Sequence, residues 1–304
     1  MTRGRWATVL LAAYFVLFLL FLYGPLLVMA VLSLQGPLGG ITFPMKGFSF
    51  DWWEALVRGS RADAIRETAM RSLRLGVVAG AVVALLAFSL SMAYRRRFRG
   101  DGALFYLVML ALMTPGFLLS LGTSLYWQFL EQIPDLWRTA LGTNVVWGLP
   151  FGFLVMIAIW NRYDRSVEEA ARDLGAGPGR TFREVTLPLV WTGLFGSFLF
   201  GFTLSWNEYD RTALVLGSGE ATLPIQIFAL TVGSVIRPDL YALGTATTIV
   251  SLLAVGIFLV VAGIWIRRRG LRAEAREEAA LAAVDLAEVV PEPASTDAAN
   301  DRAS

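Results

Sequence analysis

The sequence predicts an all-α integral membrane protein with six transmembrane helices. Hydrophobic residues make up 56% of the 304 positions, and the mean hydropathy of +0.59 is well above that of a soluble domain. Charged residues amount to only 16%, and they gather in short segments between long charge-free runs. Each of those runs is close to or above the roughly 20 residues that a helix needs to cross a bilayer.

The apolar runs place the spans in order along the chain. The predicted spans are residues 7–34, 75–94, 102–130, 139–160, 189 to about 216, and 240–266. The first run is too long for a secretory signal peptide and lacks a small-x-small cleavage site, so we interpret it as a membrane helix. Pro115-Gly116 lies within the third run, where we expect the helix to kink. The apolar segment 223–235 is too short to cross and suits a re-entrant or interfacial helix.

The arginine distribution predicts the orientation. Six spans place both termini on one side, and most of the arginines fall on that side: Arg3, Arg5, Arg95, Arg96, Arg97, Arg99, Arg162, Arg165, Arg172, Arg180, Arg183, Arg267, Arg268, Arg269, Arg272 and Arg276. The positive-inside rule then predicts cytoplasmic N and C termini. We expect one membrane domain over 1–269, followed by a cytoplasmic tail over 270–304. The tail is rich in Ala, Glu and Asp, which predicts a frayed helix running into disorder.

The composition excludes several functions. Cysteine and histidine are both absent, so the chain has no thiol nucleophile, no cysteine metal site and no imidazole base. We therefore expect no catalytic residue and no metal site. The net charge of +2 does not indicate binding to nucleic acid. The only lysine, Lys46, is not part of a phosphate-binding G-x-x-x-x-G-K-[ST] loop. This chain is therefore not itself an ATPase, and we expect it to bind no cofactor.

A polar segment, 166–188, separates the fourth and fifth spans. Ser166 is the predicted cap of a short helix that reaches residue 174 and is ended by Gly175. The run Gly177-Pro178-Gly179 predicts a turn, and a second short helix over 181–187 leads to Pro188. Proline suits the first turn of the span that follows.

This segment carries a motif at fixed spacing. The pattern is E-A-A, three residues, Gly, nine residues and Val-x-Leu-Pro, formed by Glu169, Ala170, Ala171, Gly175, Val185, Leu187 and Pro188. It resembles the EAA loop of permease subunits of binding-protein-dependent ABC importers. The alternative interpretation is an ordinary loop between two membrane helices. Small alanine side chains allow a helix to approach a groove closely, and Glu169 offers a carboxylate to a basic partner.

The resemblance implies a type I ABC importer permease fold in a bacterial inner membrane. It implies that the loop couples to a dimer of ABC ATPase subunits, which bind ATP and magnesium. It further implies a second permease subunit, which is a paralogue or another copy of this chain. An extracytoplasmic substrate-binding protein completes the implied set of partners.

Over residues 7–266 the chain also resembles the spermidine/putrescine branch of these permeases. The resemblance is clearest in segments 162–166, 202–208, 222–225 and 241–245. In that branch the fifth span carries an acidic pair, and here Glu208 matches one member while Asn207 replaces the other. Our candidates for the substrate path are Thr203, Asn207, Glu208 and Asp210, of which the first, second and fourth would share one face of a helix.

Carboxylates on such a path suit a polycationic amine, because each ammonium that leaves water needs a paired charge. Two alternatives remain for Glu208 and Asp210. They could lie at the wet outer mouth of the path, and Arg211 could neutralise Glu208 at i,i+3 spacing. For the protein as a whole, the alternatives are an importer of ferric, thiamine-like or phosphonate ligands, and a gradient-driven secondary transporter. The second of these would need ionisable residues within the spans, and we find none there between 75 and 207.

Overall fold

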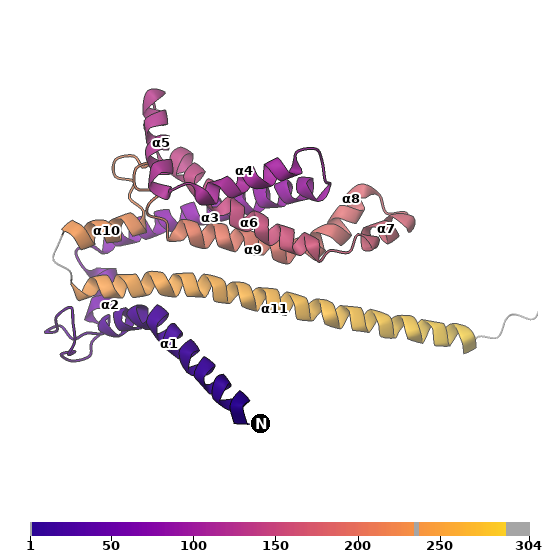
Figure 1. The fold of residues 1–304 in the computed structure, drawn as a ribbon, viewed down its shortest axis with the longest axis horizontal. Helices are drawn as coiled ribbons and strands as arrows, with labels where there is room; N and C mark the ends of the chain where they lie inside the picture. Colours follow the sequence, from indigo (N-terminus) through magenta and orange to yellow (C-terminus); the bar gives the residue numbers. More distant parts are fainter. Residues whose placement is uncertain (1, 234–236, 290–304) are drawn as a thin grey trace, which may run out of the picture. The chain divides into compact units, whose positions relative to one another are not determined.

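The computed structural model describes residues 2–233 and 237–289 (Figure 1). Within these ranges the regular structure is helical, with one isolated bridge between Gln35 and Phe48. The elements are α1 Thr2–Leu32, α2 Asp51–Arg58, α3 Ala62–Arg95, α4 Asp101–Met113, α5 Gly116–Phe129, η1 Leu136–Ala140, α6 Leu141–Asn161, α7 Ser166–Asp173, α8 Pro178–Thr181, η2 Phe182–Thr186, α9 Leu187–Trp206, α10 Leu223–Gly233 and α11 Pro238–Val289.

Five described helical stretches are long and apolar enough to cross a membrane. They are Trp6–Leu32, Ala62–Arg95, Leu136–Asn161, Pro178–Trp206 and Pro238–Trp265. A sixth span is reached if α4 and α5 count as one, but these helices meet at a bend of 99°. The break falls at Thr114, which has an extended backbone conformation, and at Pro115, which is the N-cap residue of α5. The predicted kink is therefore confirmed in position, and it is a full break, because proline removes a backbone donor and restricts the residue before it.

Two helix boundaries differ from the sequence prediction. The second span begins at Ala62 instead of residue 75. The helix can include the polar residues before 75 because Asp63 and Arg66 are exposed in its first turns, whereas Thr68 is buried. The fifth span ends at Trp206 instead of about residue 216. Asp210 consequently lies beyond the helix, and the prediction that it shares a helix face with Thr203 is wrong.

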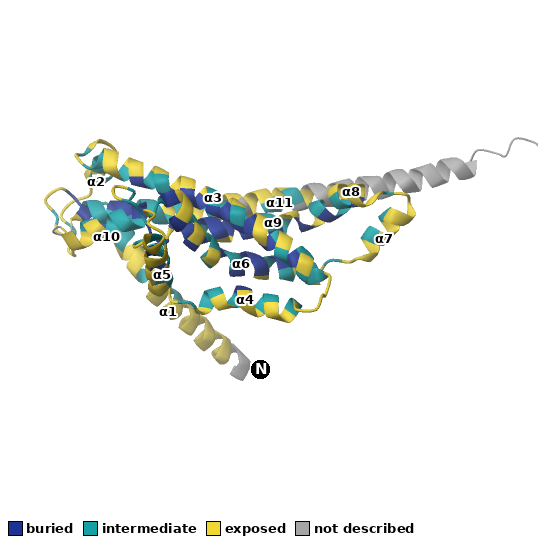
Figure 2. Cartoon of the chain, turned by 90° about the horizontal axis from the view of Figure 1, so that it is seen from above, coloured by how far each residue is buried: buried dark blue, intermediate teal, exposed yellow. Residues whose placement is uncertain are grey.

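The core of the described unit 2–256 lies where α3, α6 and α9 pack against one another, as the buried residues in Figure 2 show. Glycines allow α3 and α9 to approach closely. A Cβ atom added to Gly80 would lie 2.7 Å from the carbonyl oxygen of Phe198, and one added to Gly201 would lie 2.8 Å from the Cα of Gly80. Ser197 joins α9 to α6 by donating a hydrogen bond to the carbonyl oxygen of Gly152 at 2.9 Å. Small residues and interhelical hydrogen bonds of this kind hold membrane helices together.

The last two helices are consistent with the pattern of apolar segments. α10 is an 11-residue apolar helix, where the sequence predicts a short re-entrant or interfacial one. Its first amide, that of Leu223, donates a 2.8 Å hydrogen bond to the hydroxyl of Ser72 in α3. α11 continues past the predicted end of the sixth span, so residues 270–289 of the expected tail are helical. The rest of that tail, 290–304, lies outside the described residues.

Candidate functional site

The segment between α6 and α9 forms two short helices, α7 and α8, and the π-helical segment η2. Ser166 is the first residue of α7 and not its cap as predicted, because the N-cap position is taken by Arg165. The carboxylate of Asp164 accepts a hydrogen bond from the Ser166 amide at 2.9 Å. That backbone hydrogen bond lowers the pKa of Asp164. Gly175 ends the helix with φ of +87°, as predicted, a conformation that glycine adopts without strain. The predicted second helix begins earlier than residue 181, because Pro178 and Gly179 of the predicted turn already belong to α8, and the helix continues as η2. Pro188 lies in the first turn of α9.

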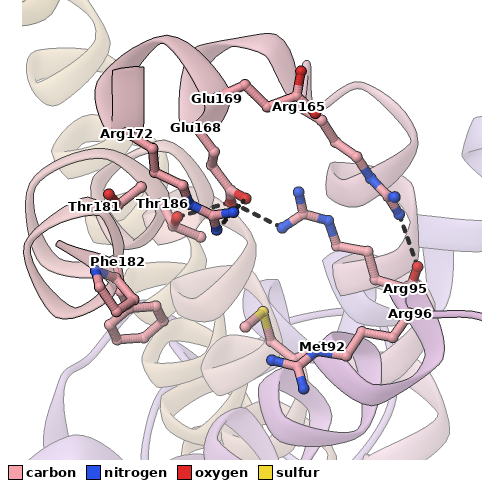
Figure 3. Close-up of a pocket in the computed structure, with 11 residues that line it drawn as sticks. Met92, Arg95, Arg96, Arg165, Glu168, Glu169, Arg172, Thr181, Phe182 and Thr186 are labelled. Atoms are coloured by element: carbon pink, nitrogen blue, oxygen red, sulfur yellow. Dashed lines mark hydrogen bonds and ion pairs between the residues drawn. The ribbon is translucent and has the colours of Figure 1, made fainter. Parts of the chain in front are cut away.

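The carboxylate of Glu168 is the centre of this segment (Figure 3). Its Oε1 atom lies 3.0 Å from Nη1 of Arg95, at the end of α3. The same oxygen accepts hydrogen bonds at 2.8 Å from the hydroxyl of Tyr163, which follows α6, and at 2.8 Å from that of Thr186, which precedes α9. Arg172 of α7 reaches Oε2 at 3.9 Å. The ends of three core helices therefore meet at one side chain, and we call Glu168, Arg95, Tyr163 and Thr186 the Glu168 junction.

Aromatic rings hold Arg95 in place at this junction. Its guanidinium carbon lies 4.6 Å from the ring centroids of both Trp160 and Tyr163. Trp160 is itself positioned by a 2.9 Å hydrogen bond from its Nε1 to the hydroxyl of Ser91 in α3. The backbone oxygen of Arg95 accepts a 2.8 Å bond from Arg165 (Figure 3). Stacking on rings while pairing with a carboxylate suits the planar guanidinium of arginine better than the ammonium of lysine.

The electrostatics of the junction keep Glu168 ionised. Burial raises the pKa of this carboxyl, but the hydrogen bonds from Arg95, Tyr163 and Thr186 and the charge of Arg95 outweigh it, and the pKa falls to about 2. Burial is also the main cause of the raised pKa of Tyr163, with Glu168 contributing. At physiological pH the carboxylate is therefore charged and the hydroxyl is protonated, so the hydrogen-bond pattern is stable.

The predicted motif divides between two environments. Glu169, Ala170 and Gly175 are exposed and Ala171 is half-buried, whereas the half-buried Val185, Leu187 and Pro188 lie at the junction of η2 with α9. Leu174, at the end of α7, is also 90% exposed. The first half of the motif thus presents an open surface, and the second half is part of the helix that enters the core.

Sequence reasoning selected Glu169 and missed Glu168. The two are adjacent on α7, about 100° apart around the helix axis, so one can face the solvent while the other faces the core. Glu168 is spaced i,i+4 from Arg172, a signal that could have pointed to it. Its main partner, Arg95, is 73 residues away in sequence. No local pattern indicates that contact.

A second group of polar residues follows the end of α9. Glu208 is buried, and its carboxylate accepts the backbone N–H of Arg211 at 2.8 Å and pairs with the Arg211 guanidinium at 3.2 Å. The predicted alternative of an i,i+3 pair between them is confirmed. The guanidinium carbon of Arg211 lies 3.6 Å from the ring centroid of Trp147 in α6.

The other candidate path residues surround the same space. Asn207 is exposed and donates hydrogen bonds to the carbonyl oxygen of Thr203 at 2.9 Å and to the hydroxyl of Ser251 at 3.4 Å. Asp210 is exposed. A hollow of about 410 Å³ is lined by Trp147, Thr203, Leu204, Asn207, Glu208, Tyr209, Asp210 and Arg211. All four predicted path residues therefore meet at one hollow, which we call the α9-end hollow, although they do not share a helix face.

Most of the chain is similar to known proteins. Residues 76–270 match the model of the family described as "Binding-protein-dependent transport system inner membrane component". The spermidine/putrescine transport system permease protein PotC of Haemophilus influenzae is 27% identical over 233 residues, 76% of this chain and 88% of that protein. The putrescine transport system permease protein PotI of Escherichia coli (strain K12) is 29% identical over 251 residues, 80% of this chain and 85% of that protein.

Solved structures show the same fold. The crystal structure of a bacterial ABC transporter involved in the import of the acidic polysaccharide alginate matches with a TM-score of 0.58 at 17% identity. That match covers 86% of this chain and 97% of the other. The matched family segment contains both the Glu168 junction and the α9-end hollow. This chain is therefore a non-catalytic, multi-pass permease subunit, and it belongs to the family of binding-protein-dependent transport system inner membrane components.

Proposed function

We propose that this permease subunit carries a polyamine, such as spermidine or putrescine, through an importer driven by a separate ATPase subunit that docks on α7. The observation that supports the ATPase coupling is the Glu168 junction. α7 presents Glu169 and Ala170 on its open side, and Glu168 fastens its other side to the ends of α3, α6 and α9. A displacement of α7 would therefore be passed to all three core helices.

The proposed docking follows from the surface chemistry of α7. Ala170 allows a close approach, the exposed Leu174 offers apolar area, and Glu169 offers a charge to a basic residue of the partner. ATP and magnesium would be bound by that partner and not by this chain. The arginine distribution supports a cytoplasmic position for the loop and for both termini, in a bacterial inner membrane. A second permease subunit, identical or paralogous, would complete the path, and a binding protein would deliver the cargo.

The α9-end hollow and the curated relatives both support a polyamine cargo. PotC and PotI are named for spermidine/putrescine and putrescine transport. The hollow carries two carboxylates, Glu208 and Asp210, which suit a cargo with several ammonium groups. One observation favours a different cargo for the same importer. Because Arg211 already neutralises Glu208, the hollow also suits an anionic or metal-chelate ligand.

The decisive experiment is a calorimetric binding screen of the partner binding protein. The ligands are putrescine, spermidine, and a panel of anions and metal chelates. Selective binding of a polyamine, followed by its ATP-dependent uptake into proteoliposomes that contain the complete complex, is the expected result. Selective binding of an anion or chelate would reject the polyamine and keep the importer. Uptake that proceeds on an ion gradient without ATP would reject the ATPase coupling.

A further inference from the structure

The side chain of Arg211 lies in a slot that three parts of the chain build. Glu208 forms one wall and the ring of Trp147 forms a second, 3.6 Å from the guanidinium carbon. The third wall is Gly116, the first residue of α5, at the 99° break after α4. A Cβ atom at Gly116 would lie only 2.9 Å from the guanidinium carbon of Arg211, so a larger residue at this position would have to move the Arg211 side chain.

The slot has the chemistry of a cation site. A carboxylate beside an aromatic face is the combination that proteins use to bind ammonium and guanidinium ions, and both parts gain strength when water is excluded. Here the side chain of Glu208 is 7% exposed and that of Arg211 is 13% exposed. Arg211 thus has the position that a free cation would take.

The backbone beside the slot is fixed independently of the guanidinium. The hydroxyl of Thr143 donates to the carbonyl oxygen of Arg211 at 3.1 Å, and the amide of Asn144 donates to the hydroxyl of Thr212 at 3.0 Å. Both donors belong to α6. The guanidinium group itself is held by Glu208 and by Trp147. It can therefore leave the slot while the backbone stays in place.

We propose that this slot is a cation-binding site, occupied at rest by the chain's own Arg211, and that an ammonium group of the cargo displaces Arg211 during transport. The inference rests on the proposed polycationic cargo. A buried carboxylate without a partner is costly, so Glu208 needs either the tethered guanidinium or a cargo cation. The exchange keeps the carboxylate paired throughout. It also makes Arg211 a plug that fills the slot at the wall of the α9-end hollow when no cargo is present.

The test uses the complete importer complex in proteoliposomes, without ATP and without binding protein. The measured quantity is the passive efflux of trapped radiolabelled putrescine. Arg211→Ala vacates the slot and is expected to raise this efflux severalfold over wild type. Arg211→Lys keeps a cation on the same tether and is expected to stay near the wild-type value. Size-exclusion chromatography of each complex establishes that it remains assembled.

Chemical rescue tests the slot directly. Millimolar guanidinium is expected to lower the efflux of Arg211→Ala towards wild type, whereas urea, a neutral molecule of the same shape, is expected to have no effect. Higher putrescine concentrations are expected to weaken the guanidinium effect by competition. In a Glu208→Gln background, Arg211→Ala is expected to cause no further rise in putrescine efflux. Guanidinium is expected to leave the efflux of this double variant unchanged, because the carboxylate that would bind it is absent.

Three outcomes of these efflux measurements would contradict the proposal. Unchanged efflux in Arg211→Ala, or equal closure by urea and guanidinium, overturns the slot as a cation site and leaves the proposed cargo to the binding screen. Rescue by guanidinium that putrescine does not weaken overturns the exchange between Arg211 and a polyamine. Efflux that rises equally for a neutral solute of similar size makes Arg211 a steric plug and also overturns the proposal.

Discussion

Arg95, the last residue of α3, and Glu168, in the first turn of α7, form an ion pair with 3.0 Å between Nη1 and Oε1. Their side chains are only 13% and 15% exposed, so solvent screens this pair less than an ordinary surface pair. The pair links a core helix to the loop that we propose as the ATPase docking element. Removing one partner of such a pair leaves the other buried and uncompensated, which is the costly change.

Glu168→Gln is expected to destabilise the protein. The amide keeps the size of the side chain but loses the charge that balances Arg95, so the free energy of unfolding should fall by about 2 kcal/mol. Thermal unfolding of the purified protein in detergent measures the effect. Glu169→Gln is the matched control, because Glu169 is the adjacent, exposed residue of the same helix, and its substitution should change the stability by no more than about 0.5 kcal/mol. Equal melting temperatures for the two variants would contradict the junction.

The stability contributed by Glu168 should be lost in acid. Its pKa is lowered from an ordinary value of 4.5 to about 2 in the folded state. Because the folded pKa is the lower one, this contribution is fully present above pH 4.5 and disappears as the pH falls through about 2. The gap in melting temperature between wild type and Glu168→Gln should therefore be constant from pH 8 to about 5 and narrow below that. A gap that stays constant down to pH 3 would show that the ionised carboxylate is not the cause.

Glu169→Lys is expected to uncouple transport. The substitution reverses a charge on the open face of α7, where we propose that Glu169 pairs with a basic residue of the ATPase, while the contacts of Glu168 are untouched. Uptake into proteoliposomes should be lost, and the subunit should still be found in the membrane fraction. Asp63→Lys reverses an equally exposed charge in the first turn of α3, far along that helix from Arg95, and should keep uptake. Wild-type uptake by Glu169→Lys would refute the docking assignment.

Gly201→Ala is expected to separate α3 from α9. The added Cβ would lie 2.8 Å from the Cα of Gly80 and 2.9 Å from the Cβ of Val83, so the helices must shift, at a cost of about 1–3 kcal/mol. Gly122→Ala in α5 meets no atom within 4 Å and should be neutral or slightly stabilising. Melting temperatures in detergent compare the two. Equal values would mean that the close approach of α3 and α9 is not needed for stability.

Local features of the chain determined the predictions that are confirmed. Whether a segment is long and apolar enough to cross a bilayer depends on that segment alone, which is why five spans follow from hydropathy. The break within the third apolar run follows from Pro115. Gly175 and Pro188 likewise act on the backbone next to them, so the end of α7 and the start of α9 follow from residue type. The spacing of the motif that begins at Glu169 was sufficient to indicate the family to which the chain belongs.

Contacts between distant segments decided the rest. The sequence places Glu168 beside Glu169, but only the packing of α3 against α6 and α9 brings Arg95 to the first and leaves the second exposed. The slot around Arg211 needs Gly116, Trp147 and Glu208 to meet, and these belong to three different parts of the chain. Hydropathy measures the preference of each side chain for an apolar environment over water. It carries no information about which helices become neighbours. The partners that are distant in sequence, Arg95 for Glu168 and Trp147 for Arg211, were therefore settled by the tertiary structure.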